Sequence, residues 1–259
     1  MKQKLKVVKI GGNVIDDKDS LASFLTDFAL MSGYKILVHG GGKKATQMAS
    51  ALGLQPVFVG GRRITDEANL EIAAMVYAGL LNKTIVAGLQ SRDCNAIGLS
   101  GADGNVIEAH KRIVKDVDYG FAGDVDRVNT QMVSLLLQNE MCPVFCAITH
   151  NGQGQLLNTN ADTIAAEVAK GLAADYEVEL IYCFEKNGVL LTLEDDNSVI
   201  EKIDPVLYSN LKEKGIIAAG MLPKLENCFL ALNTGVSKVV IGNPSVIKAN
   251  QQKFTTLSL

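Results

Sequence analysis

The sequence predicts an α/β protein whose central sheet is mostly parallel and carries helices on both faces. Apolar runs of strand length alternate along the chain with segments of helical periodicity. Two of the strand-like runs end in glycines, in the sequences KIGG (9–12) and HGGG (39–42). Because the carboxyl ends of parallel strands meet at one edge of a sheet, we expect these two turns to face one crevice.

The first part of the chain supplies most of these elements. Leu21, Phe24 and Phe28 share one face at helical spacing, and Gly33 is a natural C-terminal stop for their helix. Thr65 can N-cap a long helix that has acidic residues in its first turn. The expected elements are, in order, strand 4–12, helix 17–32, strand 35–38, helix 43–52, hairpin 56–65, the long helix, hairpin 95–112, helix 130–140, strand 143–148 and helix 160–173.

The second part of the chain repeats the alternation. Asp204 and Pro205 open a helix as its cap and first-turn proline. The best candidate for a boundary within the chain is 172–177, between a predicted helix and a predicted strand. We therefore expect one domain with two lobes, residues 1–173 and 174–259. The expected elements here are strand 178–184, hairpin 188–200, a helix from 205, helix 220–235 and strand 238–242.

Composition narrows the class of protein. The 259 residues are 47% hydrophobic and 20% charged, which is ordinary for a globular chain, and the formal charge of −3 gives no reason to expect nucleic acid or an acidic membrane. No apolar run reaches about 18 residues and no signal-peptide core follows the N-terminus, so the cytoplasm is the default expectation. Five cysteines and three histidines offer little for a metal site, and Cys142 and Cys146 are expected to be packed thiols.

Three ligand-binding interpretations compete for the glycines at 40–42. A dinucleotide fingerprint fits loosely through Ala45, although an arginine pair stands where an acid is usual and would suit a 2′-phosphate. The oxyanion hole of an α/β-hydrolase needs a G-x-S-x-G elbow, which the chain lacks. An open phosphate cradle would use backbone N–H groups at a helix N-terminus. One glycine turn alone can serve only to turn the chain, but two turns facing one crevice favour a densely anionic ligand.

Six segments spread over essentially the whole chain form a specific combination of motifs. They are VVKIGGNV (7–14), VHGGGKK (38–44), GRRIT (61–65), GLSGADG (98–104), NTNADTIAAEVA (158–169) and GMLPKLENCFLAL (220–232). In this order they resemble the N-acetylglutamate kinase family of the amino-acid kinase superfamily. The resemblance implies an open three-layer α/β/α sandwich with a mostly parallel central sheet, the amino-acid kinase fold.

The resemblance also implies an activity. ATP, with Mg²⁺, would phosphorylate the γ-carboxylate of an N-acyl-L-glutamate in arginine biosynthesis, with N-acetyl-L-glutamate as the first choice of acceptor. The lobe 1–173 would bind the acyl-glutamate and form a homodimer, and the lobe 174–259 would bind ATP. Relatives inhibited by arginine carry an extra N-terminal helix, so a plain dimer without arginine feedback is expected. No metal site made by protein side chains is predicted.

Three residues carry the catalytic expectation. By resemblance, Lys9 reaches the transferring phosphoryl group, Lys224 is a second cation on its leaving side, and Asp162 holds both lysines by charge-assisted hydrogen bonds. Taken singly, each has an ordinary explanation as a strand-end lysine, a snorkelling lysine or a first-turn helix acid. A γ-carboxylate with a pKa of ~4.3 is already ionised at neutral pH, so positioning and positive charge suffice without a general base.

The acceptor is expected to meet Arg63 and Asn158. By resemblance, the planar guanidinium of Arg63 binds a carboxylate, while Arg62 on the same strand would point the opposite way. Asn158 would bind the α-carboxylate or the acyl amide, or else would cap the following helix. Gly41 and Gly42 would offer N–H donors to the substrate.

The nucleotide is expected to meet Gly11 and Gly12, through their N–H groups, and the segment CFEKNGV (183–189). This segment departs from the family pattern T/S-D-V-x-G-V: Glu185 takes the place of the aspartate, and Phe184 and Lys186 are unusual. By position alone, Ile217 and Ala218 are expected near the nucleotide.

Several alternatives stay open. The acceptor can be N-succinyl-L-glutamate, for which Arg62 would be one candidate for a further cation. The chain can also be a kinase of a free amino acid, carbamate or a nucleoside monophosphate. A non-catalytic regulator and an NADP-binding protein belong to other classes, and the retention of Lys9, Lys224 and Asp162 argues against the regulator.

Overall fold

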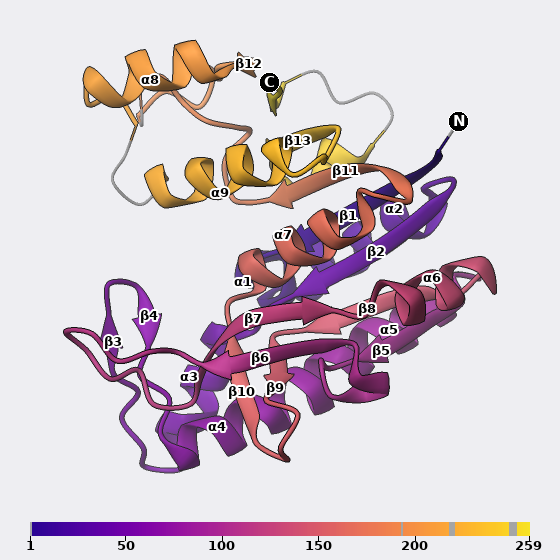
Figure 1. The fold of residues 1–259 in the computed structure, drawn as a ribbon, viewed down its shortest axis with the longest axis vertical. Coiled ribbons are helices and arrows are strands. Elements are labelled where there is room, and N and C mark those ends of the chain that lie inside the picture. The colour runs from indigo at the N-terminus through magenta and orange to yellow at the C-terminus, as the bar shows by residue number, and fades with distance from the viewer. Residues whose placement is uncertain (1, 193, 218–220, 249–252) are drawn as a thin grey trace.

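One eight-stranded sheet forms the centre of the computed structural model, which describes residues 2–192, 194–217, 221–248 and 253–259 (Figure 1). Every neighbouring pair of strands is parallel except β13 with β14, which confirms the predicted fold class. In spatial order the strands are β12 (Lys202–Ile203), β14 (Thr255–Leu257), β13 (Lys238–Gly242), β11 (Tyr176–Cys183), β1 (Gln3–Ile10), β2 (Tyr34–His39), β8 (Cys142–Cys146) and β5 (Ala96–Leu99).

Helices cover both faces of this sheet (Figure 1). One face carries α6 (Thr130–Gln138), α7 (Ala161–Leu172) and α9 (Leu222–Asn233). The other carries α2 (Lys18–Leu30) and a continuous helix made of α4 (Glu67–Ala74), the π-helical η1 (Met75–Leu81) and α5 (Asn82–Gln90). The remaining helical segments are α1 (Gly12–Asp16), α3 (Gly42–Ala51), η2 (Asp103–Asn105), α8 (Pro205–Glu213) and η3 (Pro244–Ile247).

A second, smaller sheet closes on itself beside the first. Its order is β10 (Leu156–Thr159), β7 (Ala122–Val128), β6 (Ile107–Lys111) and β9 (Ile148–His150). The expected hairpin 95–112 is therefore wrong, because β5 pairs with β8 in the main sheet while β6 joins the small one. The Asp-Gly pair does turn the chain, but it does so within η2, which carries the chain from one sheet to the other.

One further local expectation needs correction. Asp66, not Thr65, caps the long helix, since its carboxylate accepts a hydrogen bond from Asn69 N at 2.8 Å. The described residues of 188–200 agree with the expected hairpin, since Leu190 and Val199 form an antiparallel bridge and Ile200 N donates to Val189 O at 2.8 Å. The hairpin of β3 (Phe58–Val59) and β4 (Arg62–Arg63) is confirmed, with both turn glycines at positive φ.

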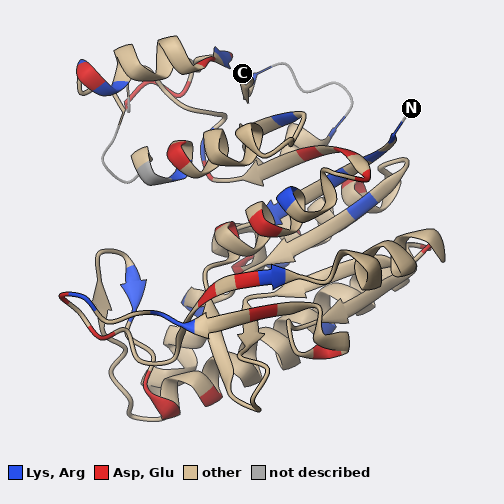
Figure 2. Ribbon diagram, viewed as in Figure 1, with Lys and Arg blue, Asp and Glu red and all other residues tan. Residues whose placement is uncertain are grey.

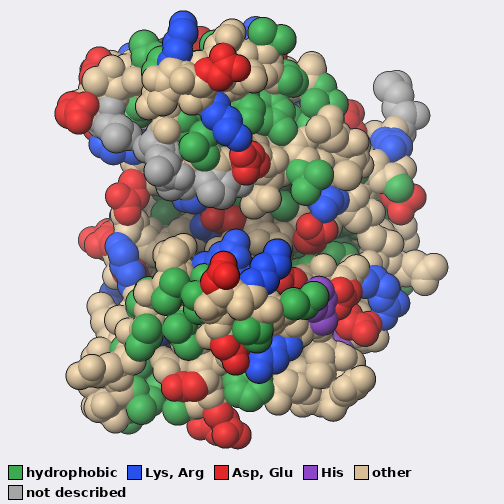
Figure 3. All heavy atoms as spheres, turned by 60° about the vertical axis from the view of Figure 1, so that its left-hand side comes forward, with side chains coloured by type: hydrophobic (Ala, Val, Ile, Leu, Met, Phe, Trp, Pro, Cys, Tyr) green, Lys and Arg blue, Asp and Glu red, His purple; other side chains and the backbone are tan. Residues whose placement is uncertain are grey.

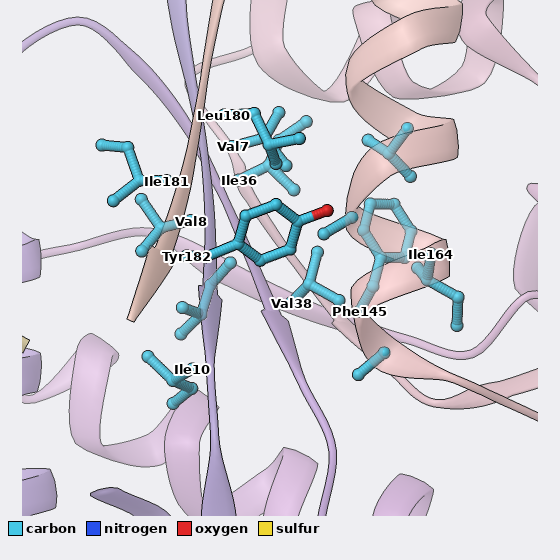
Figure 4. Close-up of a cluster of buried hydrophobic side chains, with 14 of the residues drawn as sticks. Val7, Val8, Ile10, Ile36, Val38, Phe145, Ile164, Leu180, Ile181 and Tyr182 are labelled. Carbon is cyan, nitrogen blue, oxygen red and sulfur yellow. The ribbon is translucent and has the colours of Figure 1, made fainter. Parts of the chain in front are cut away.

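The core lies on both faces of β1, β2 and β11. Val7, Val8 and Ile36 are fully buried, and Figure 4 shows Val8 beside Ile181 on one side of the strands, with Phe145 of β8 and Ile164 of α7 on the other. Burial on both faces explains why these strands are near-continuous apolar runs instead of alternating ones. All five cysteines are free and buried, in agreement with the expectation of packed thiols.

The continuous helix Glu67–Gln90 is long and apolar enough, by length and composition alone, to cross a membrane. Its apolar face is nevertheless used inside the protein, where Ile72, Val76, Ile85 and Leu89 are buried. α5 packs on β5, β8 and α2, so this helix covers one face of the sheet.

Candidate active site

The two glycine turns lie side by side at the carboxyl edge of the main sheet. β1 and β2 are adjacent parallel strands, with Ile10 in register with His39. Gly12 begins α1 and Gly42 begins α3, so each turn leads into the start of a helix. Gly11, Gly12 and Gly42 line the same two cavities, which confirms that both turns face one crevice.

Gly41 has a separate reason to be glycine. Its φ is 155°, and a Cβ there would lie 2.4 Å from Leu81 Cδ1 and 2.8 Å from Tyr77 Cδ1. The π-helical segment η1 brings both side chains against the turn. Gly11 is different, because the nearest atom to a Cβ there would be Cys183 O at 3.7 Å.

Alanine at these two glycines is expected to separate folding from catalysis. Gly11→Ala should keep the free energy of unfolding within ~1 kcal/mol of the wild type. It should lower kcat by ~10-fold or more, because its methyl group enters the space of the ligand. Gly41→Ala should lower the free energy of unfolding by about 1–3 kcal/mol through overpacking. Urea unfolding and steady-state kinetics measure both effects, and normal turnover of Gly11→Ala would exclude close approach of ligand to that turn.

Two cavities meet at these turns. The larger, ≈ 510 Å³, extends toward α9 and the segment after β11, and the smaller, ≈ 270 Å³, extends toward β4, β10 and the start of α7. Figure 3 shows a hollow between the upper and lower parts of the molecule, with Lys and Arg side chains along its lower rim. The residues common to both cavities are Lys9, Gly11, Gly12 and Gly42.

Both cavities are lined by an excess of positive charge. The smaller has four basic side chains and one acidic one, namely Lys9, Arg62, Arg63, Arg112 and Asp162. The larger has the same balance, namely Lys9, Lys43, Lys186, Lys224 and Glu185. Figure 2 shows β4 in blue beside the blue end of β6, where the arginines of the smaller cavity gather. Such an excess raises the local concentration of anionic ligands.

Lys9 is held at the end of β1 by Asp162. Its Nζ lies 2.7 Å from Asp162 Oδ1, and both side chains are mostly buried. Asp162 is fixed in the first turn of α7, whose N-cap Asn160 accepts a hydrogen bond from Asp162 N at 2.8 Å. The contact is an ion pair without aligned hydrogen-bond geometry, since the buried Oδ1 has no hydrogen-bond partner among the described residues.

Lys224 is not held by Asp162, which corrects the expectation that this aspartate contacts both lysines. Within the described ranges no ion pair reaches Lys224 Nζ, which lies 4.0 Å from the ring centroid of Phe184. The same ring lies 5.3 Å from Lys9 Nζ. The resemblance described above implies Thr or Ser at position 184; the face of the Phe184 ring instead attracts the ammonium group of Lys224.

Arg63 is a buried cation on the wall of the smaller cavity. Its Nη2 donates to Thr46 Oγ1 at 2.7 Å and to Gly42 O at 3.1 Å, and the guanidinium lies 4.8 Å from the ring centroid of Phe58. No carboxylate of the described residues pairs with it. Arg62, on the opposite side of β4, is exposed, as the alternation of strand side chains predicts.

Asn158 lies on β10 and lines the same cavity. Its Nδ2 donates to Thr65 Oγ1 at 3.0 Å, which fixes the amide beside the cavity. The helix that follows is capped by Asn160, so capping does not explain Asn158. Its side chain therefore points to a binding or structural role at the cavity wall.

The predicted nucleotide residues line the larger cavity where the structure describes them. Glu185 and the buried Ile217 both do so, whereas Ala218 lies outside the described residues. Asn13 Nδ2 donates to Glu185 Oε1, and Lys43 Nζ donates to Asn13 Oδ1. These contacts connect residues 1–173 with residues 174–259 at the cavity.

His39 is the last residue of β2 and contacts the second glycine turn. It is fully buried, its Nδ1 lies 2.8 Å from Gly40 O, and its Nε2 lies 3.1 Å from Asn82 Nδ2. The neutral tautomer that donates from Nδ1 and accepts at Nε2 satisfies both contacts. Burial lowers the pKa of His39 to about 4, so the ring stays neutral under the second glycine turn.

We expect His39 to destabilise the protein in acid. Between pH 6.5 and about 4 the unfolded chain protonates this residue and the folded chain does not. Stability is therefore lost as the pH falls through this window, by about 3 kcal/mol in total. His39→Gln retains a donor and an acceptor but cannot titrate. Urea unfolding at pH 7 and pH 4 should show a smaller loss for the variant, and equal losses would contradict the assignment.

Sequence reasoning missed several polar residues of the site. Asn13 follows KIGG directly and was available from its position, and Arg112 ends a short basic run after β6. Arg112 is paired with Asp124, its Nε donating at 3.0 Å, and this hydrogen bond lowers the pKa of Asp124. Tyr77 lies in an apolar helical stretch, and no sequence motif marked it as a site residue.

The fold and this cationic double cavity define a class of phosphoryl-transferring kinases. Residues 4–243 match the model of the amino acid kinase family, and the chain therefore belongs to that family. A solved structure of smu.665 from Streptococcus mutans superposes with a TM-score of 0.76 at 26% identity, covering 98% of each chain.

Within the family the chain is similar to acetylglutamate kinases. The acetylglutamate kinase of Phocaeicola vulgatus is 53% identical over 247 residues, which cover 95% of this chain and 96% of the relative. That of Bacteroides thetaiotaomicron is 52% identical over 251 residues, covering 97% and 98% of the two chains. The similarity extends over both lobes.

Proposed function

We propose that this chain is an acetylglutamate kinase, which transfers the γ-phosphoryl group of ATP to the γ-carboxylate of N-acetyl-L-glutamate in arginine biosynthesis. The observation that carries the proposal is the pair of cavities that meet at Lys9, Gly11, Gly12 and Gly42. ATP occupies the larger cavity and the acceptor the smaller one, so the phosphoryl group crosses at the residues common to both. The similarity to acetylglutamate kinases at about half identity supports the same assignment.

The residues of the site supply what this reaction needs. The acceptor carboxylate is ionised at neutral pH, and its repulsion from the triphosphate is the main electrostatic obstacle. Lys9 binds the transferring group, Lys224 the leaving side, and Asp162 fixes Lys9. The N–H groups of the two glycine turns stabilise the negative charge that spreads over the phosphoryl oxygens. Arg63 binds an acceptor carboxylate and Asn158 its polar groups.

Mg²⁺ fits this site as an ion that arrives with ATP. The described residues contain no group of three or more potential metal ligands, and Mg²⁺ in kinases is held largely by phosphates and water with one or two carboxylates. Glu185 is the carboxylate on the larger cavity that would complete its shell, whereas Asp162 Oδ1 is paired with Lys9. The ion neutralises charge on the phosphate oxygens when bound.

Trapping of the product with hydroxylamine tests the function. The enzyme is incubated with Mg-ATP and hydroxylamine, and N-acetyl-L-glutamate, N-succinyl-L-glutamate, L-glutamate and carbamate are offered in parallel. We expect hydroxamate with the N-acyl-glutamates and ADP in equal amount. The smaller cavity, with its three arginines, favours N-succinyl-L-glutamate as a second candidate, because a third carboxylate would have a cation to meet. Turnover of glutamate or carbamate alone would overturn the proposal.

We also propose that the lobe 1–173 forms a homodimer. Exposed apolar side chains on α3, at its C-cap and on the neighbouring helix α4–η1 support it, namely Met48, Leu52, Met75 and Leu80. Sedimentation equilibrium should give twice the chain mass of 27.7 kDa. The chain mass itself at micromolar concentration would contradict the dimer.

A further inference from the structure

Phe184 occupies the point where the two lysines of the site come closest to one aromatic ring. The Nζ of Lys224 lies 4.0 Å from its centroid and that of Lys9 lies 5.3 Å away. Both distances fall within the range of about 6 Å over which the face of an aromatic ring attracts a cation. The ring lines the larger cavity together with both lysines.

Two contacts position the ring of Phe184. Phe184 follows the last residue of β11, and its N–H donates to Gly242 O at 2.7 Å, which ties it to the end of β13. Its ring is stacked on Tyr182, with centroids 5.9 Å apart and planes 10° from parallel. Tyr182 is buried, and its hydroxyl donates to Asp162 O at 3.1 Å. Figure 4 shows the Tyr182 ring directed from β11 toward α7.

The two lysines differ in how their charge is balanced. Lys9 is neutralised by Asp162, whereas Lys224 Nζ has no anionic or hydrogen-bonding partner among the residues that the structure describes. A carboxylate beside Lys224 would fix it but would also cancel its charge, and a phosphate would then have to displace an ion pair. An aromatic face fixes the ammonium group and leaves its full charge available to the incoming phosphate.

We propose that Phe184 is a positioning residue that holds the ammonium groups of Lys224 and Lys9 at the phosphoryl-transfer point before the nucleotide binds. This inference rests on the proposed kinase function. It assigns a role to a residue that the resemblance did not predict for the site. Phe184 acts through the two lysines and is preorganised by Tyr182, which links it to the helix that carries Asp162.

A substitution series at this position tests the proposal. Phe184→Leu keeps an apolar side chain without a ring, and we expect kcat to fall about tenfold while both KM values change less than about threefold. Phe184→Tyr keeps the ring and should retain kcat within about twofold. Incorporation of 4-fluoro-, 3,5-difluoro- and 3,4,5-trifluorophenylalanine keeps the shape while withdrawing charge from the ring face, so kcat should fall stepwise with each fluorine. A kcat that is constant across the fluorinated series would overturn the proposal.

A second readout does not depend on activity. Protons on Cε of a lysine above an aromatic ring are shifted upfield, and the Lys224 signal in lysine-labelled protein is assigned by its loss in Lys224→Met. We expect the shift in the nucleotide-free wild type, its loss in Phe184→Leu, and its decrease on addition of a non-hydrolysable ATP analogue. An unshifted Lys224 signal in the wild type overturns the positioning role. Absence of hydroxamate with every acceptor, beside a shifted signal, would instead refute the proposed kinase function.

Discussion

Replacement of Lys224 by methionine is expected to lower kcat by ~10²–10³-fold with little change in stability. The loss is that expected for one charged donor removed from a transition state whose charge spreads over phosphoryl oxygens. Lys224 makes only a cation–π contact with Phe184 among the described residues, so the free energy of unfolding should change by less than ~1 kcal/mol. KM for ATP should rise only a few-fold, because the interaction is strongest in the transition state.

Lys9→Met should reduce kcat to a similar extent but should also destabilise the fold. Its removal leaves the mostly buried carboxylate of Asp162 unpaired, a change that typically costs about 3–5 kcal/mol. The double variant Lys9→Met with Asp162→Asn removes that charge and should recover much of the stability. It should recover none of the activity, because it lacks both the ammonium group of Lys9 and the carboxylate of Asp162.

Hydroxamate formation under saturating substrates and urea unfolding measure the two effects separately. Lys212→Met is a matched control for loss of one positive charge, because Lys212 is exposed on α8 and lines neither active-site cavity. It should keep kcat within about twofold of the wild type. Unchanged turnover in Lys224→Met or in Lys9→Met would remove that lysine from the mechanism.

The sequence predicted the parallel core of the fold because its strands are buried on both faces. Short apolar runs in the sequence mark the strands β1, β2, β8 and β11. Each run can be recognised locally, without knowledge of the strand with which it pairs. The small closed sheet was not predictable in the same way. β7 carries charged residues along much of its length, and β10 has only four residues, so neither has a clear strand period.

The same limit applies to the site. Lys9, the glycine turns and the first turn of α7 could be predicted because they belong to local strand-to-helix motifs. The partner of Lys224 could not, since it depends on which residue of the segment after β11 faces α9. The family pattern predicted an aspartate contact, and the bulky ring of Phe184 provides the observed one. At this position, where the sequence does not match the motif, the structure was needed to identify the contact of Lys224.

Arg63→Met is expected to raise KM for the N-acyl-glutamate by ~10–100-fold, with kcat and KM for ATP changed far less. The magnitude is that of one charge-assisted hydrogen bond to a carboxylate. Arg63 is buried, has no carboxylate partner among the described side chains, and lines the smaller cavity. Arg63→Lys should recover only part of the affinity, because an ammonium group cannot reproduce the planar fork.

Arg62→Met provides the matched control for this prediction and separates the two acceptors. Arg62 lies on the same two-residue strand but is exposed, and it lines the same cavity. With N-acetyl-L-glutamate the variant should keep KM within about threefold, since both acceptor carboxylates are served elsewhere. With N-succinyl-L-glutamate KM should rise more if the third carboxylate meets Arg62. A normal KM for either acceptor in Arg63→Met would exclude Arg63 from the acceptor site, because no other buried arginine in the described part of the cavity replaces it.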